Sequence, residues 1–104
     1  MKPVVRRAKA DEDIRSAIGF YRKKVPNYTE PFIEAFREAL QHLSQHPGTG
    51  SPRYAHELDI PGLRFWKCTQ FPYLVFYVER SDAIDLWRVL HESRDIPSSL
   101  QSSD

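Results

Sequence analysis

The chain of 104 residues has the length of one ordinary domain, and 40% of its residues are hydrophobic, enough to build a buried core. Charged residues make up 28% of the sequence, which excludes a protein embedded in a membrane. Fifteen basic and 14 acidic side chains leave a net charge of +1, so the chain lacks the overall positive field that drives non-specific nucleic-acid binding.

Positive charge is concentrated near the N-terminus, where residues 1–24 carry 8 basic and 3 acidic side chains. Residues 22–24 are three of these cations, and they fall in the last turn of a predicted helix. Cations at that position complement the negative end of the helix dipole. A structural role therefore explains this cluster from the sequence alone.

Cys68 is the single cysteine, which excludes an intramolecular disulfide and a cysteine metal cluster and favours a reducing compartment. The N-terminal segment shows no apolar run of signal-peptide length. The longest apolar stretch, residues 73–78, is too short to span a bilayer. We expect a cytoplasmic protein without a membrane partner.

The first half of the chain predicts a short strand followed by two helices. Residues 4–8 begin with two β-branched side chains, which favours a strand. A helix is predicted from Asp11 to the residues before Pro26, with one apolar face formed by Ile14, Ala17, Ile18, Tyr21 and Val25. Thr29 is the predicted cap of a second helix that ends at residues 46–48. Its apolar face consists of Phe32, Phe36, Ala39, Leu40 and Leu43.

The second half predicts strands. Residues 47–52 form a turn rich in glycine and proline, after which no further helix is expected. Strands are predicted at residues 63–67, 73–79 and 83–90, with a tight turn at residues 81–82. The fold class is therefore α+β in the order β-α-α-β-β-β, with a helical hairpin packed on a small antiparallel sheet and the first strand at one edge. We expect one domain over residues 1–96 and a polar, flexible tail over residues 97–104.

Three possible chemical sites are not supported by their surroundings. His42 and His46 have the four-residue spacing of a metal-binding pair, but two ligands do not make a site. Cys68 has no nucleophile motif around it, and the four glycines form no phosphate-binding loop. We predict no metal and no cofactor.

Cationic and titratable side chains gather near the end of the last predicted strand. Arg88, His91 and Arg94 lie there, and Arg64 can join them from a neighbouring strand. Such a group can bind phosphate, orient RNA for attack by its own ribose hydroxyl, or pair with nearby carboxylates. The sequence leaves these alternatives open.

The predicted strands carry more aromatic side chains than one face of a sheet can hold. They are Phe65, Trp66, Phe71, Tyr73, Phe76, Tyr77 and Trp87. Because side chains alternate along a strand, some of them must point outward and form an apolar face suited to a protein partner. Residues 60–104 carry 5 basic and 6 acidic side chains, so base stacking in a positive groove is less favoured.

Several short motifs occur in a specific order over some ninety residues. They are Ala10-x-x-Asp13-Ile14 with Phe20-Tyr21, His46-Pro47-x-x-Gly50, Pro61-Gly62-Leu63-Arg64-Phe65-Trp66, Tyr73-Leu74-Val75-Phe76-Tyr77, and Arg88-Val89-Leu90-His91-x-x-Arg94-Asp95. In combination they resemble the ParE branch of the RelE/ParE toxin superfamily of bacterial toxin–antitoxin modules. The resemblance implies a small toxin, with the hairpin-on-sheet fold, that is held inactive by a cognate ParD-like antitoxin.

The same resemblance implies two different targets. ParE-like members inhibit DNA gyrase, whereas RelE-like members are ribosome-dependent mRNA endonucleases that use basic residues and often a C-terminal tyrosine. This chain has Tyr73 where RelE-like toxins tend to have an arginine, and no tyrosine follows Arg94. We therefore predict a gyrase inhibitor that acts by binding rather than by bond chemistry of its own. An RNA endonuclease and an inactive antitoxin-binding relative are the alternatives.

The site predictions follow from position and chemistry, and no catalytic residue is assigned. The predicted target-binding residues are Arg64, Trp66, Arg88, His91 and Arg94. The predicted antitoxin-binding residues, on the first helix and the sheet, are Ile14, Ile18, Tyr21, Phe65 and Tyr73. The predicted partners are the antitoxin and gyrase. We predict no direct, sequence-specific binding to DNA.

Overall fold

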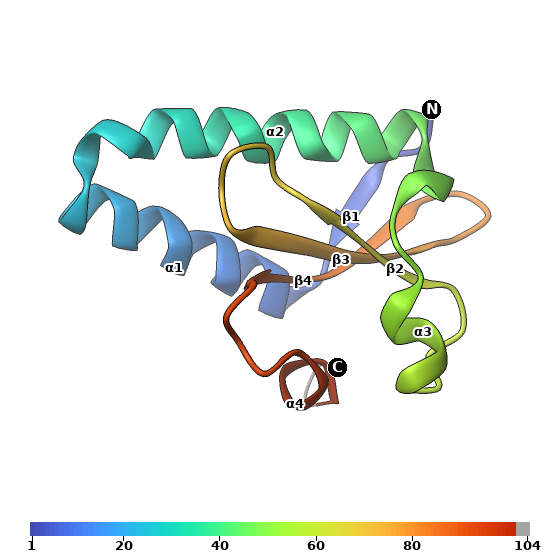
Figure 1. The fold of residues 1–104 in the computed structure, drawn as a ribbon. Coiled ribbons are helices and arrows are strands. Elements are labelled where there is room, and N and C mark those ends of the chain that lie inside the picture. The colour runs from blue at the N-terminus through green and yellow to red at the C-terminus, as the bar shows by residue number, and fades with distance from the viewer. Residues whose placement is uncertain (102–104) are drawn as a thin grey trace.

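The computed structural model describes residues 1–101 as a four-stranded sheet between two helical layers (Figure 1). A hairpin of two long helices covers one face, and two short helices lie against the other. The elements are β1 (Val4–Arg6), α1 (Ala8–Lys24), η1 (Pro26–Tyr28), α2 (Thr29–Gln45), η2 (Pro47–Thr49), α3 (Arg53–Glu57), β2 (Leu63–Lys67), β3 (Tyr73–Glu79), β4 (Ile84–His91) and α4 (Ile96–Gln101). No helix within residues 1–101 is both long and apolar enough to cross a membrane.

The sheet has the strand order β1-β4-β3-β2. Strands β2, β3 and β4 form an antiparallel meander, which confirms the three strands predicted from the second half of the chain. β1 lies at the edge, as predicted, but it pairs with β4 in parallel, with Val4 opposite Ile84. The sheet is therefore mixed rather than antiparallel, because the helical hairpin carries the chain back to the end of the sheet at which β1 begins, where the Lys2 N–H donates to the Ser44 carbonyl at 3.1 Å.

The two long helices confirm the predicted hairpin, with differences at their starts. α1 begins at Ala8, three residues before the predicted start at Asp11. The prediction that Thr29 caps α2 is wrong. The Thr29 N–H donates to the Pro26 carbonyl in η1, so the helical backbone begins before Thr29. Thr29 is therefore the first residue of α2 and not its N-cap. Its hydroxyl is buried and has no hydrogen-bond partner among the described residues.

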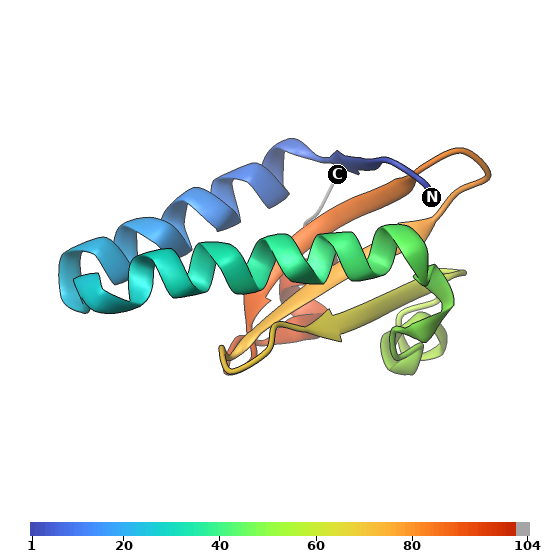
Figure 2. The same cartoon turned by 90° about the horizontal axis from the view of Figure 1, so that it is seen from above.

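One core layer lies between the helical hairpin and the sheet. Phe36 and Leu43 of α2 pack there with Val75, Tyr77 and Leu86 of the strands. Tyr77 and Leu86 are completely buried. Figure 2 shows α1 and α2 side by side above the strands, with the turn that joins them extending past the end of the sheet. The hairpin therefore covers one face of the sheet, and its closed end, where α1 and α2 are joined, projects beyond the strands.

A second core layer covers the opposite face of the sheet and corrects two predictions. Phe76 is completely buried, and Phe65 and Trp87 are partly buried against α3 and α4. The outward aromatic face predicted to bind a partner is thus largely covered by the chain itself. Helix formation also continues beyond residue 52, in two segments that are too short to show a clear periodicity.

The C-terminal segment contributes to this second layer. Residues 97–101 belong to α4, in which Ile96 is 4% exposed and Leu100 is 1% exposed. The prediction of a flexible tail is therefore wrong for residues 97–101. Burial of the Leu100 side chain removes apolar surface from water, and this favours an ordered helix despite the polar residues around it. Residues 102–104 of the predicted tail lie outside the described residues.

Candidate partner-binding surfaces

Arg88, predicted to bind the target, lies inside the protein. Its side chain is 8% exposed, and its Nε and Nη2 donate to the Asp13 carboxylate at 2.7 and 3.0 Å. Nη1 donates to the Ser99 carbonyl at 2.9 Å. The hydrogen bond to Asp13 raises the pKa of Arg88, so the guanidinium stays charged. Arg88 thus joins α1, β4 and α4, and in this conformation it is not available to a partner.

A β-bulge on β4 determines the face of the sheet on which Arg88 lies. Phe76 pairs with Arg88 and Tyr77 pairs with Leu86, so Trp87 is the extra residue on β4. Beyond the bulge the alternation shifts by one residue. Val89 therefore joins Leu86 in the core under the helical hairpin, while Arg88 turns toward Ser99 of α4.

His91 and Arg94 remain at the surface. Arg94 is exposed, and its Nη2 lies 3.4 Å from the Ser99 hydroxyl. The His91 ring is partly buried, edge-on to Tyr73 at a centroid distance of 5.3 Å, and its Nδ1 accepts a hydrogen bond from the Ser93 N–H. These two residues form the accessible part of the predicted cationic group.

Arg64 and Trp66 lie on β2, which β3 separates from β4, and they contact the segment after α2 and the end of α2, respectively. The Trp66 ring stacks on His42 at 4.2 Å, and Arg64 Nη1 donates to the Gly50 carbonyl at 2.7 Å. The Gly50 N–H donates to the Tyr77 hydroxyl at 3.0 Å. A Cβ at Gly50 would lie 2.3 Å from that hydroxyl oxygen, so the close approach requires glycine. The glycine of the His46-Pro47-x-x-Gly50 motif therefore has a structural explanation.

A groove runs between α1 and α2 on the outer side of the hairpin. It has a volume of about 210 Å³ and contains two of the predicted antitoxin-binding residues, Ile14 and Ile18. The remaining lining residues are Arg6, Ile33, Phe36, Arg37 and Leu40. Ile33 and both arginines were not among the residues predicted from the sequence to bind the antitoxin. The spacing of Ile33, Arg37 and Leu40, which places them on one side of α2 beside the core stripe, was the available signal.

The other three predicted antitoxin-binding residues lie elsewhere. Tyr21 and Tyr73 pack with Phe32, at centroid distances of 5.0 and 5.2 Å, in an aromatic cluster under the hairpin. Burial raises the pKa of both tyrosines, which keeps their hydroxyls neutral. Phe65 lies on the opposite face of the sheet, 5.4 Å from the Phe76 ring. The predicted set therefore does not form one surface.

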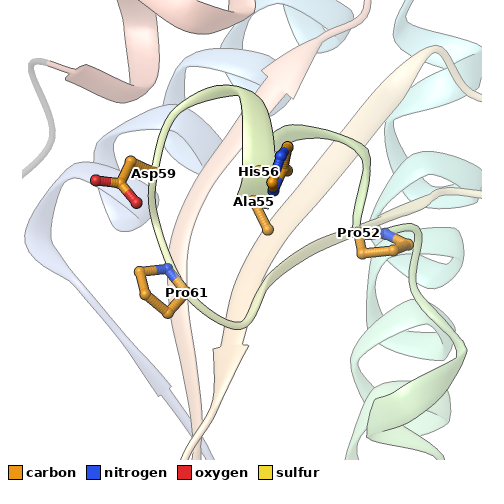
Figure 3. A pocket seen from close by; sticks show the side chains of 5 residues that line it. All are labelled: Pro52, Ala55, His56, Asp59 and Pro61. Carbon is orange, nitrogen blue, oxygen red and sulfur yellow. The ribbon is translucent and has the colours of Figure 1, made fainter.

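A histidine pair and a surface hollow lack the groups that a chemical site requires. The rings of His42 and His46 are 5.3 Å apart, but within residues 1–101 no group of three potential metal ligands occurs. A shallow hollow of about 410 Å³ beside α3 is lined by Pro52, Ala55, His56, Asp59 and Pro61 (Figure 3). The Asp59 carboxylate does not point toward the His56 ring, so the two do not form an acid–base pair.

Comparisons with known proteins agree with the motifs. Residues 4–96 match the family described as "ParE toxin of type II toxin-antitoxin system, parDE". No curated protein matches the sequence. Among solved structures, a chain of the "Chromosomal ParDE TA system from P. aeruginosa" has a similar fold, with a TM-score of 0.71 and 19% identity over 88% of this chain and 96% of that chain. Because the family match spans most of the sequence, the chain belongs to the ParE toxin family of type II toxin–antitoxin systems.

Proposed function

We propose that this toxin inhibits DNA gyrase by binding to it and that a cognate ParD-like antitoxin neutralises it. Membership of the ParE family supports gyrase as the target. The ion pair between Arg88 and Asp13 favours inhibition by binding over RNA cleavage. Cleavage of RNA requires a base for the 2′-hydroxyl, charge stabilisation at the phosphate and a proton for the leaving oxygen. Because Asp13 and Ser99 already bind the Arg88 guanidinium, this cation is not free to stabilise a phosphate.

The accessible target-binding residues in this proposal are His91 and Arg94. His91 is the last residue of β4, and Arg94 lies between β4 and α4 and is exposed. Arg64 and Trp66 lie on β2, apart from His91 and Arg94, and contact Gly50 and His42, so the proposal gives them a structural role. The proposal therefore assigns direct contacts to His91 and Arg94 and a structural role to Arg88.

The groove between α1 and α2 is our proposed antitoxin site. Ile14, Ile18, Ile33 and Leu40 give it an apolar floor, which fits the apolar side of an amphipathic antitoxin segment. Arg37 lies at its edge with a side chain that is 69% exposed, so a carboxylate of the antitoxin can reach it. An antitoxin segment bound there would cover apolar surface without disturbing the core.

The gyrase target is tested with purified toxin. We expect inhibition of DNA supercoiling by gyrase, and intact mRNA on translating ribosomes. Arg94→Ala should raise the inhibitory concentration about tenfold, which corresponds to the loss of about 1.4 kcal/mol of binding. Arg53→Ala is the matched control, because Arg53 is an exposed cation on α3, away from His91 and Arg94. Codon-positioned mRNA cuts together with unaffected gyrase would establish the endonuclease alternative instead.

The antitoxin site is tested by coexpression with the cognate antitoxin. Expression of the toxin alone should stop growth, and the antitoxin should restore it. Ile18→Glu places a carboxylate in the apolar groove and should weaken antitoxin binding about 100-fold, as measured by calorimetry. Ser16→Glu, two residues away at an exposed position of α1, should leave the affinity unchanged. Equal antitoxin affinities for both variants would place the antitoxin elsewhere.

A further inference from the structure

The tip of the helical hairpin, residues 20–31, extends past the strands (Figures 1 and 2). Arg22, Lys23 and Lys24 follow one another in the last turn of α1, and all three are exposed. Glu30 is the only acidic residue in this segment of the sequence. The tip therefore presents three exposed cations, spread around the last turn of α1, on a projecting part of the molecule.

Neither the helix dipole nor neighbouring carboxylates neutralise these cations. The C-terminus of a helix carries a partial charge of roughly −0.5, far less than three positive charges. Within residues 1–101, none of the three cations forms an ion pair. Other basic residues near the N-terminus do, since Lys2 pairs with Glu79 and Arg7 pairs with Asp85. The unneutralised charge is thus a local property of the tip in a chain whose net charge is only +1.

An open hollow of about 390 Å³ lies at the same tip, between η1, the first turn of α2 and the loop before β3. It is lined by Asn27, Tyr28, Pro31, Gln70 and Phe71. Tyr28 is 54% exposed, and Phe20 of the same tip is 52% exposed. The hollow therefore offers aromatic surface and two side-chain amides at the same end of the hairpin as the positive charges.

We propose that the hairpin tip binds the phosphate backbone of DNA without sequence preference. Arg22, Lys23 and Lys24 contact phosphates, and Asn27 and Gln70 hydrogen-bond to phosphate or sugar oxygens. Charge favours DNA over a protein partner here, because lysine is depleted in protein interfaces whereas lysine and arginine neutralise DNA phosphates. The inference extends the proposed function, since an inhibitor bound to gyrase would reach the DNA that the enzyme holds.

The test measures binding to DNA without gyrase. Fluorescence anisotropy of a labelled 20-base-pair duplex is followed during titration with purified toxin at several NaCl concentrations. Three phosphate contacts predict a slope of about −2.7 for log K against log salt, with dissociation constants of about 10⁻⁴ to 10⁻⁶ M, typical of non-specific binding. Arg22→Gln/Lys23→Gln/Lys24→Gln should weaken binding at least tenfold and flatten the slope.

A control with the same net charge separates the tip from overall electrostatics. Arg53→Gln/Lys67→Gln/Arg80→Gln removes three exposed cations elsewhere and should change the affinity less than twofold. Circular dichroism establishes that both variants are folded. Failure of the wild-type toxin to bind the duplex, or equal losses in both variants, would overturn the proposal.

The gyrase assay distinguishes this inference from the proposed function. Loss of gyrase inhibition in the tip variant with unchanged duplex binding would mean that the tip contacts protein, which also overturns the proposal. Tip-dependent duplex binding by a toxin that does not inhibit gyrase would support the DNA contact and reject the gyrase target.

Discussion

Arg88→Ala is expected to lower the free energy of unfolding by about 3–5 kcal/mol, the usual cost of removing one partner from a buried ion pair. The change leaves the Asp13 carboxylate, whose side chain is 12% exposed, without its main cation. It also leaves the Ser99 carbonyl without the guanidinium donor, which loosens α4. Because small domains are stable by about 5–15 kcal/mol, urea denaturation followed by circular dichroism will detect the loss easily.

Two related variants separate the ion pair from simple loss of side-chain volume. Arg88→Lys keeps the charge but loses the two-pronged contact with Asp13, so it should also be destabilising. Asp13→Leu/Arg88→Met removes both charges and should be more stable than Arg88→Ala, because no unpaired charge stays buried. A value within about 0.5 kcal/mol of wild type for Arg88→Ala would show that the pair has no structural role.

Phe76→Ala should cost about 3–5 kcal/mol, the range for truncating a large buried aromatic side chain. Phe76 is completely buried between the sheet and α3, and its ring lies 6.0 Å from Tyr54 and 5.4 Å from Phe65. The backbone around it is paired on both sides with β2 and β4, so the cavity has little room to collapse. Reduced soluble yield and a lower urea midpoint are the expected observations.

Phe20→Ala is the matched control for this loss. Phe20 is 52% exposed on α1, so the same change in chemistry removes little buried surface there. Its effect on the free energy of unfolding should stay within about 0.5 kcal/mol, as for most surface positions. Comparable losses in the two variants would mean that the layer formed by α3 and α4 is not a stabilising core.

The sequence predicted the elements whose patterns are long and regular. The apolar spacing of the two long helices and the β-branched and aromatic runs of β2, β3 and β4 are local signals, and each was confirmed. Short elements have weak signals, because five or six residues complete barely more than one helical turn. α3 and α4 were missed for this reason, although Leu100 is almost completely buried.

The sequence by itself determined the family and the helical hairpin on a sheet, because motif order and hydrophobic periodicity can be observed in the sequence without knowledge of tertiary contacts. Only the tertiary structure decided which side chains face a partner. Alternation along a strand separates its two faces, but the bulge at Trp87 changes the face on which Arg88 lies. Helix α4 covers part of the aromatic face that the sequence predicted to be exposed. Asp13 and Arg88 are 75 residues apart, so their ion pair depends on how α1 packs beside β4. Local sequence reports polarity, whereas contacts between distant segments decide whether a charge is buried or available.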